Sequence, residues 1–243
     1  MIVKTCMAAL VLAATSYTAH AAPIIFFGEN QTAPFEIGTE PAAARAAFLS
    51  NLTGVGTEDF EGFAVGANSP LDILFAGSSG DITATLNGSG QIAGGGSNSV
   101  GRFNTSPGGS QWWDTSGQFS LNFDTAISAF GFYGTDIGDF NGQITVALTD
   151  TDNNVTNLII DNTVNGIDAA NLFWGFIDLD MAYTSITFGN TAAGTDFFGF
   201  DDFTIGDRQQ VSIPDTRVSE PGTLAIFALS VFGLMAYRRR QRR

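Results

Sequence analysis

The chain contains one lysine, one cysteine and one histidine, and all three lie within its first 20 residues as Lys4, Cys6 and His20. If this segment is a leader, the remaining protein lacks these side chains. Their absence excludes Ser-His-Asp and Cys-His catalysis, thiolate or imidazole zinc sites, Schiff-base lysines and lysine-dependent phosphate loops. It also excludes disulfides, so a packed core must stabilise the protein. A two-carboxylate glycoside hydrolase or a calcium-assisted reaction survives.

Positive charge is also scarce. The chain has 24 acidic residues against 10 Lys and Arg, and its formal net charge is −14. Without Lys4, nine arginines leave −15, and loss of the tail from Glu220 onward leaves four arginines against 23 acidic residues, or −19. Such a domain repels phosphates, so we predict no nucleic-acid binding. It also repels polyanionic polysaccharides unless a divalent cation bridges them, although acidity that only keeps an exported protein soluble explains the composition equally well.

The N-terminus predicts a secretory signal peptide over residues 1–21. Lys4 supplies a positive start, residues 6–14 are apolar, and Ala19-His20-Ala21 has the small-x-small pattern of a cleavage site. We expect cleavage after Ala21 or Ala22.

The C-terminus predicts a membrane stop. Residues 222–237 form one uncharged apolar run, which we expect to be a transmembrane helix. An arginine cluster follows it and would hold that end on the cytoplasmic side: Arg238, Arg239, Arg240, Arg242 and Arg243. The run is shorter than the ~20 residues of an ordinary span, so a temporary anchor suits it, while a permanent anchor stays open.

The residues before this run are Ser219, Glu220 and Pro221. Together with the apolar run and the arginines, they resemble the PEP-CTERM sorting signal of bacterial surface proteins, with Ser219 in place of the first proline. The resemblance covers residues 219–243. It implies that an exosortase-like membrane protease recognises the motif and removes the tail. The protein would then pass transiently through the inner membrane to the cell surface or extracellular matrix.

Alternation of apolar and polar residues predicts short strands in the body of the chain. It is clearest at residues 82–86, 119–123, 144–148 and 185–188, and clusters of Gly, Asn, Asp and Ser separate the strands. Asp152-Asn153-Asn154 predicts a hairpin turn. At least eight strands without helical crossovers predict an all-β fold, an antiparallel β-sandwich of jelly-roll type. We expect the sandwich over 57–207, a linker over 208–218 and the sorting signal over 219–243.

Residues 22–56 are expected to form an N-terminal lead. Within it, 23–38 should be extended or loosely ordered, and one short helix should run from Pro41 to Leu52. Thr39 can cap this helix, Ala44 and Phe48 share a face with Leu52, and Gly54 ends it. Residues 77–109 are rich in Gly and Ser and should contain a long mobile loop as well as a strand.

An aromatic-Gly-aromatic pattern occurs three times, at residues 130–132, 174–176 and 198–200. In a strand, the two rings point to one face with a bare backbone position between them. We interpret the three segments as equivalent core strands, with room for a partner ring over the glycine.

The central region also resembles a recurrent type of PEP-CTERM protein over about residues 40–207. The segments that carry this resemblance are 57–63, 103–109, 129–140, 188–191 and 199–203. This resemblance implies where the protein is located, as an exported protein, more than any chemical activity.

Acidic residues suggest a metal site. The pairing of Glu61 with Asp201 or Asp202 resembles jelly-roll carbohydrate-binding modules, in which a glutamate of the first strand and an aspartate of the last hold a structural calcium. Calcium prefers six to eight oxygen ligands, so others would be needed. One aspartate should lie in apolar surroundings and requires a cation or backbone amides as partners, although a solvent-exposed pair at a strand end is the alternative.

The sequence has two further acidic groups. Asp136 and Asp139 form a second cluster in the loop after Phe132. Residues 150–161 begin like an EF-hand loop, but Val155 stands where glycine is needed, so a turn is preferred.

The candidate carbohydrate-binding residues are Trp112 and Trp113. Adjacent residues of a strand face opposite ways, so one tryptophan could be exposed and stack on a sugar ring. The alternative, which we favour, is that both cover the sandwich core.

These features predict an exported surface or matrix protein without enzymatic activity. Its role would be structural or adhesive in exopolysaccharide or biofilm, with polysaccharide or other surface proteins as partners. A calcium-dependent, lectin-like carbohydrate-binding module is the alternative. A glycoside hydrolase ranks below both, because no spacing identifies an acid and a nucleophile.

Overall fold

The computed structural model describes residues 21–194 and 196–213. The predicted signal peptide and the predicted transmembrane helix lie outside these residues, apart from Ala21. Among the described residues, no helix is both long enough and apolar enough to cross a membrane. Contacts divide the chain into two compact units, and the fold below belongs to the unit Met1–Ser212.

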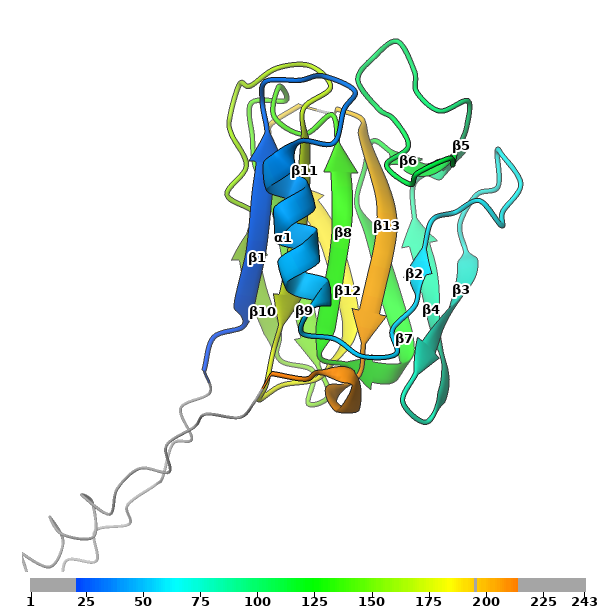
Figure 1. The fold of residues 1–243 in the computed structure, drawn as a ribbon, viewed down its shortest axis with the longest axis vertical. Helices are drawn as coiled ribbons and strands as arrows, with labels where there is room; N and C mark the ends of the chain where they lie inside the picture. Colours follow the sequence, from blue (N-terminus) through cyan, green and yellow to red (C-terminus); the bar gives the residue numbers. More distant parts are fainter. Residues whose placement is uncertain (1–20, 195, 214–243) are drawn as a thin grey trace, which may run out of the picture. The chain divides into compact units, whose positions relative to one another are not determined.

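The fold is a sandwich of two antiparallel sheets with one α-helix against it (Figure 1). The first sheet has the order β1 (Ile24–Asn30), β11 (Asn171–Ile177), β8 (Ala129–Thr135), β13 (Phe198–Gly206), β6 (Trp112–Thr115) and β5 (Gln91–Ala93), with β2 (Thr57–Glu58) paired to β13. The second sheet has the order β10 (Val155–Ile159), β9 (Ile144–Asp150), β12 (Tyr183–Asn190), β7 (Phe119–Ile127), β4 (Gly80–Gly88) and β3 (Leu71–Gly77).

The connections give the jelly-roll character that the sequence predicts. From β7 onward the chain passes to β8 in the first sheet, to the β9–β10 hairpin in the second, and then alternates through β11, β12 and β13. The four clearest alternating segments lie in β4, β7, β9 and β12, as expected. The predicted turn at Asp152-Asn153-Asn154 joins β9 to β10.

The N-terminal lead differs from the prediction. Residues 24–30 form a regular edge strand, β1, paired along its whole length with β11. The sandwich therefore begins well before Thr57. Exposed Ile and Phe residues gave no clear alternation there, and only pairing with a distant strand fixes the segment as a strand.

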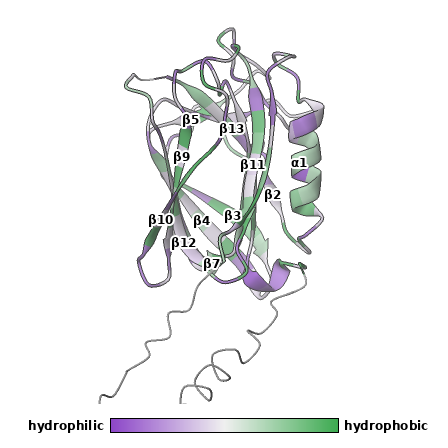
Figure 2. Ribbon diagram, turned by 90° about the vertical axis from the view of Figure 1, so that its left-hand side faces the viewer, coloured by the Kyte–Doolittle hydropathy of each residue, from purple (hydrophilic) through white to green (hydrophobic). Residues whose placement is uncertain are grey.

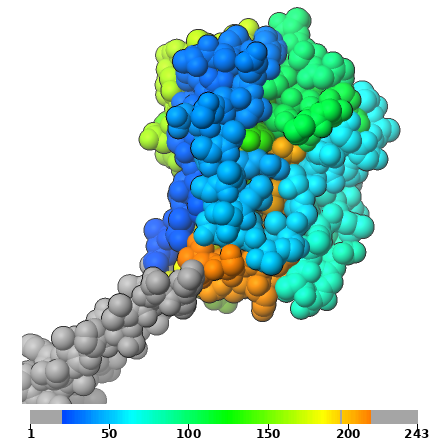
Figure 3. Space-filling view, viewed as in Figure 1, coloured from blue at the N-terminus to red at the C-terminus, as the bar shows by residue number. Residues whose placement is uncertain are grey.

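The predicted helix exists with shifted ends. Helix α1 spans Thr39–Leu49, and Gly38 rather than Thr39 is its N-cap. It ends before Leu52, which instead forms a bridge with Val211. A long-range contact thus removes Leu52 from the helix that its spacing suggested. Figure 3 shows residues of α1, in blue, covering part of one face of the sandwich.

The three aromatic-Gly-aromatic segments are core strands, as predicted. They lie on β11, β8 and β13, which are neighbours in the first sheet. Register places Trp174 opposite Phe132 and Phe176 opposite Phe130, and all these rings are buried. Figure 2 colours the strands by hydropathy and shows α1 packed beside the first sheet.

The glycines of this pattern make room for the helix. Gly131 lies directly opposite Gly175 across β8 and β11. The ring of Phe48 from α1 lies over both, with ring contacts to Phe26 and Phe173. A Cβ on Gly131 would come within 2.9 Å of the Phe48 ring, and one on Gly175 within 3.2 Å. The first sheet is thus covered on both faces.

Aromatic rings also join the two sheets. Phe188 of β12 stacks on Phe119 of β7 at 4.4 Å between centroids. On its other sides it meets Phe130, Phe132 and Phe200 of the first sheet edge-on, at 5.3–5.9 Å. Offset and edge-on contacts of this kind add to the free energy gained from burial of the rings.

Replacement of Gly131 by alanine should therefore destabilise the fold. The added methyl group collides with the Phe48 ring, and overpacking of this kind typically costs about 1–3 kcal/mol. Chemical denaturation measures the loss. Gly62→Ala is the matched control, because a Cβ there meets nothing within 4 Å. Equal stability of the two variants would contradict the proposed contact. In the double mutant Gly131→Ala/Phe48→Leu, the smaller side chain should reduce the stability loss caused by Gly131→Ala.

Candidate functional site

Both predicted carbohydrate-binding tryptophans are buried. Trp112 and Trp113 on β6 are 1% and 0% exposed. Trp113 packs on Phe119 in the core, and the indole N–H of Trp112 donates to Asp114 at 3.4 Å. Neither ring can stack on a sugar, so the prediction of a tryptophan platform was wrong. The alternative is confirmed for Trp113, which belongs to the core between the two sheets. Trp112 is also buried but lies outside that core cluster.

The carboxylates predicted to hold calcium have other partners. Glu61 accepts hydrogen bonds from the backbone N–H of Ser110 at 2.5 Å and of Gln111 at 2.6 Å. Burial acts to raise the pKa of Glu61, but these hydrogen bonds outweigh it and leave the pKa lowered. The glutamate therefore anchors the end of the loop between β5 and β6.

Asp201 anchors the same loop from β13. Its carboxylate accepts hydrogen bonds from the N–H of Thr105 at 2.7 Å and from the Thr105 hydroxyl at 3.0 Å. The side chain is fully buried, and burial together with neighbouring Asp202 raises its pKa to about 8. A backbone amide thus serves as a partner of the buried Asp201 carboxyl group. The sequence predicted either backbone amides or a cation in this role.

Asp202 lies at an irregularity in β13, where the register with β8 shifts and φ reaches +53°. It accepts a hydrogen bond from the hydroxyl of Ser106 and lies 3.7 Å from Arg45 of α1. Burial raises its pKa, against the effects of Ser106 and Arg45. The positive φ turns Asp202 so that two consecutive aspartates can each reach the loop.

In the described part of the chain, Glu61, Asp201 and Asp202 are not among the groups of three or more acidic side chains close enough to share a metal ion. Calcium at Glu61 with Asp201 or Asp202 stays a prediction. The three carboxylates instead hold successive positions of one loop. The same oxygen chemistry suits backbone amides and calcium, so the sequence could not distinguish the two.

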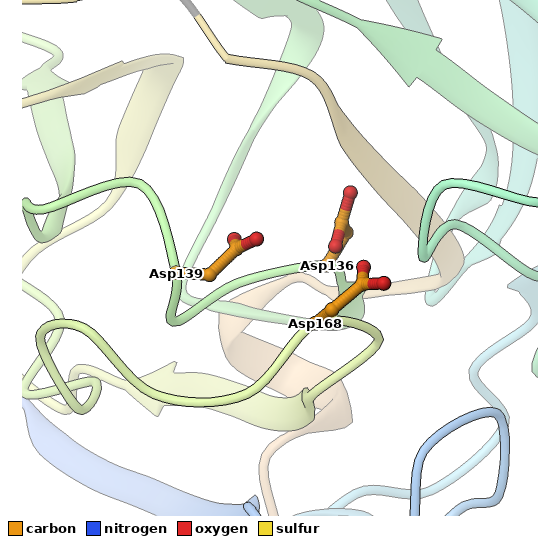
Figure 4. Close-up of side chains that lie close together, drawn as sticks. All are labelled: Asp136, Asp139 and Asp168. Carbon is orange, nitrogen blue, oxygen red and sulfur yellow. The ribbon is translucent and has the colours of Figure 1, made fainter.

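A different acidic cluster has the dimensions of a cation site. Asp136 and Asp139 follow β8, and Asp168 precedes β11. A carboxylate oxygen from each lies within 4.8 Å of the others, and Figure 4 shows the three side chains directed toward a common space. The sequence singled out Asp136 and Asp139. Asp168 follows in a loop about thirty residues later and carries no motif that could have identified it.

The cluster lines a cavity of about 550 Å³ at the end of the sandwich where these loops meet. The lining residues are Ser99, Val100, Arg102, Asp136, Asp139, Asp168, Asp196 and Phe197. Four loops contribute, and pairing of β11, β8 and β13 brings three of them together. In Figure 1 this is the upper end of the strands.

The electrostatics of the cavity favour a cation. Burial and the neighbouring Asp139 and Asp168 raise the pKa of Asp136 to about 7. Burial, Asp196 and Asp168 raise the pKa of Asp139. Close acidic groups disfavour one another's charged form, and a bound cation would relieve that repulsion.

One basic side chain, Arg102, belongs to the lining among the described residues. It lies 2.5 Å from Asp114 and 3.6 Å from Asp136, so it is already engaged with two carboxylates. Four aspartates with a single arginine leave an excess of negative charge. Hard carboxylate oxygens suit Ca²⁺, which would take its remaining ligands from water or from a bound molecule.

The cavity also has an exposed aromatic ring. Phe197 is 47% exposed, and the guanidinium of Arg102 lies 5.0 Å from its centroid. The ring also borders a second cavity of about 210 Å³, whose lining includes Asp114, Gln91 and Asn68. The arginine therefore lies against the ring and links it to the acidic cluster.

Comparison with known families identifies the C-terminal signal. The model of the PEP-CTERM protein-sorting motif matches residues 217–241. The chain therefore carries this motif, as the sequence predicts. No curated protein matches the chain.

Several solved structures are similar at low identity. The K2 cleaved adhesin domain of Lys-gingipain is 14% identical, with 62% of this chain and 97% of that domain covered and a TM-score of 0.40. The xylan-binding domain CBM22-1 of Paenibacillus barcinonensis Xyn10C is 11% identical, with 65% and 94% covered and a TM-score of 0.36. The C-terminal family 22 carbohydrate-binding module of Clostridium thermocellum Xyn10B is 14% identical, with 65% and 97% covered and a TM-score of 0.37.

The raised pKa of Asp201 gives a prediction for stability. The group binds its proton more tightly in the folded state than in the unfolded chain, where the pKa is about 3.9. Its stabilising contribution is therefore present at low pH and is lost as the pH rises from about 4 through about 8. Each unit of pKa difference corresponds to about 1.4 kcal/mol.

Asp201→Asn should flatten this part of the pH profile of unfolding free energy, because an amide does not titrate in this range. Urea denaturation between pH 4 and 9 measures both proteins. Asp152→Asn, on the exposed β9–β10 turn, controls for the loss of one charge. A constant difference between wild type and D201N across the range would contradict the assignment.

Proposed function

We propose that the protein is exported through the secretory pathway and sorted at the inner membrane by an exosortase-like protease. The PEP-CTERM motif at residues 217–241 supports this proposal, and the predicted signal peptide at the other end agrees with it. The protease would act near Glu220 and Pro221, and the arginines beyond residue 237 would hold the tail until then. The sandwich would reach the cell surface or the extracellular matrix.

Replacement of Glu220 and Pro221 by alanine should stop sorting in the native host. The larger, unprocessed protein should then accumulate in the membrane fraction, because the anchor is not removed. Immunoblots of membrane, surface and medium fractions measure this. Asp215→Ala lies upstream of the motif and is the control. Normal release of the double variant would contradict processing at this motif.

We further propose that the sandwich binds a glycan at the cavity beside Phe197, with Ca²⁺ held by Asp136, Asp139 and Asp168. The single observation that carries this proposal is the meeting of three carboxylates and an exposed aromatic ring at one cavity. Glycans offer hydroxyl oxygens that can complete a calcium coordination sphere. They also have apolar ring faces that pack on an aromatic side chain.

Charge restricts the kind of glycan. At a net charge of −14 the chain repels polyanions, so a neutral polysaccharide suits it best. A polyanion would depend on the bound cation as a bridge. Binding of this kind would give the protein an adhesive role within extracellular polysaccharide. It assigns binding and no catalysis to the cavity.

Calcium titration of residues 22–219 tests the cation site. Calcium should raise the melting temperature, because a ligand that binds only the folded state stabilises it. The double variant Asp139→Asn/Asp168→Asn should lose most of this calcium-induced increase in melting temperature. The control is Asp152→Asn/Asp161→Asn, which removes the same amount of charge from residues 150–161. Its melting temperature should respond to calcium as that of the wild type does. No shift in wild type, or an equal shift in D139N/D168N, would exclude the site.

Polysaccharide binding is tested with a panel of neutral and acidic glycans, in calcium and in chelator. We expect binding that disappears in chelator, and at least tenfold weaker binding for Phe197→Ala, which corresponds to about 1.4 kcal/mol. Phe27→Ala, a comparably exposed ring on β1, is the control. Binding that survives chelation would exclude the calcium role, and binding unaffected by F197A would exclude this cavity. Release of soluble sugar would favour a hydrolase instead.

A further inference from the structure

The outer strands of the two sheets differ in how they are protected. Among the described residues these strands are β1, β5, β3 and β10. Natural sheets protect their edges with charge, with proline or by keeping the edge strand short. Strand β1 carries Glu29, β3 carries Asp72, and β5 has three residues. Strand β10, Val155–Ile159, has none of these features although the chain is strongly acidic.

Strand β10 exposes two large apolar side chains, Val155 and Ile159, beside the uncharged polar side chains of Thr156 and Asn157. Val155 lies beside Thr149 and Ile159 beside Thr145 on the outer face of the second sheet. Val155 is 54% exposed and Ile159 60% exposed. Strand β10 lies at the margin of the sandwich in Figure 2.

The backbone of β10 is also available for pairing. The N–H of Ile160 donates to Ile144 at 2.8 Å, and the N–H of Asp150 donates to Asn154 at 3.0 Å. Hydrogen-bonded pairs alternate along an antiparallel ladder. The N–H and C=O groups of Val155, Asn157 and Ile159 therefore point away from β9, which is the one strand paired with β10 in the described part of the chain.

We propose that a second copy of the chain pairs with this edge, β10 against β10, about a two-fold axis at Asn157. The strand is complementary to itself in this register. Val155 of one copy lies opposite Ile159 of the other, and Thr156 lies opposite Leu158. The outward-pointing backbone groups of Val155, Asn157 and Ile159 meet their counterparts, and each such pair exchanges two hydrogen bonds. The two six-stranded sheets become one continuous sheet.

The absence of charge on β10 favours a second copy as the occupant. Two chains of net charge −14 repel one another over most of their surface, and an uncharged edge is where they can approach. Asp152 and Asp161 flank the strand, and the pairing brings Asp152 of one copy toward Asp161 of the other. Salt screens such repulsion, so the association should strengthen as ionic strength rises.

The dimer should be weak and reversible. A contact of one short strand buries less than the ~1,200 Å² typical of stable interfaces. On a cell surface, even weak pairing would place two chains side by side, each with its cavity beside Phe197. Two linked binding sites hold a ligand with repeated units more tightly than one site does. The inference itself does not depend on the proposed glycan binding.

A cysteine at the axis tests the geometry. The full-length protein carries Cys6→Ser, so that Asn157→Cys is its only cysteine, and is oxidised in detergent solution. Hydrogen-bonded residues of an antiparallel pair have Cα atoms ~5.5 Å apart, within the range of a disulfide. We expect N157C to form disulfide-linked dimers at least tenfold faster than Leu74→Cys. Leu74 is 66% exposed on β3, the opposite edge of the same sheet.

A second substitution separates specific pairing from random collision. Ile159→Glu in the N157C protein should reduce the cross-linking rate at least tenfold, because it places a charge opposite Val155 of the other copy. Val65→Glu, at a 66% exposed position in a loop, should leave the rate unchanged. Thermal unfolding checks that both variants fold. Equal rates for N157C and L74C, or no effect of I159E in a folded protein, would overturn the proposal. A rate that falls as salt is added would overturn it as well.

Discussion

Burial of the first sheet on both faces is the constraint on which the rest of the molecule depends. Its inner face meets the second sheet through aromatic rings around Phe188. Its outer face meets α1 through Phe48, which fits only because Gly131 and Gly175 lie opposite one another and have no side chains. With much of the sheet covered, the cavity beside Phe197 lies where loops meet at the end of the strands. Packing thus decides where a binding site can be.

The acidic residues fall into two structural roles. Glu61, Asp201 and Asp202 accept hydrogen bonds from the loop between β5 and β6 and hold it against β13. The cluster of Asp136, Asp139 and Asp168 instead lines a cavity, with fewer donors to compensate its charge. Hydrogen bonds from one loop engage the first set, whereas only the second set brings three carboxylates close enough to share a cation. The loop held by the first set also contributes Arg102 to the cavity lined by the second.

Much of the architecture could be predicted from local pattern. The alternating segments and the three aromatic-Gly-aromatic segments became strands because a period of two fixes which side chains are buried. The strand at Ile24–Asn30 was missed because its pairing partner, β11, lies more than a hundred residues away. Part of the candidate site was visible as Asp136 and Asp139. Asp168 and Phe197 were not, because nothing local marks loop residues that meet only after the strands are ordered.

The sequence alone determined the class of fold and the sorting motif. The reason is that hydrophobic patterning and a contiguous motif depend on residues that are neighbours in the chain. They can therefore be recognised without the three-dimensional structure. Tertiary structure decided that Trp112 and Trp113 are buried. It also decided that Glu61 and Asp201 accept hydrogen bonds from backbone N–H groups, whereas Asp136, Asp139 and Asp168 lie close to one another. Those outcomes depend on strand order and on contacts between distant segments, and identical local sequences can be placed on either side of a sheet by a shift of one residue in register.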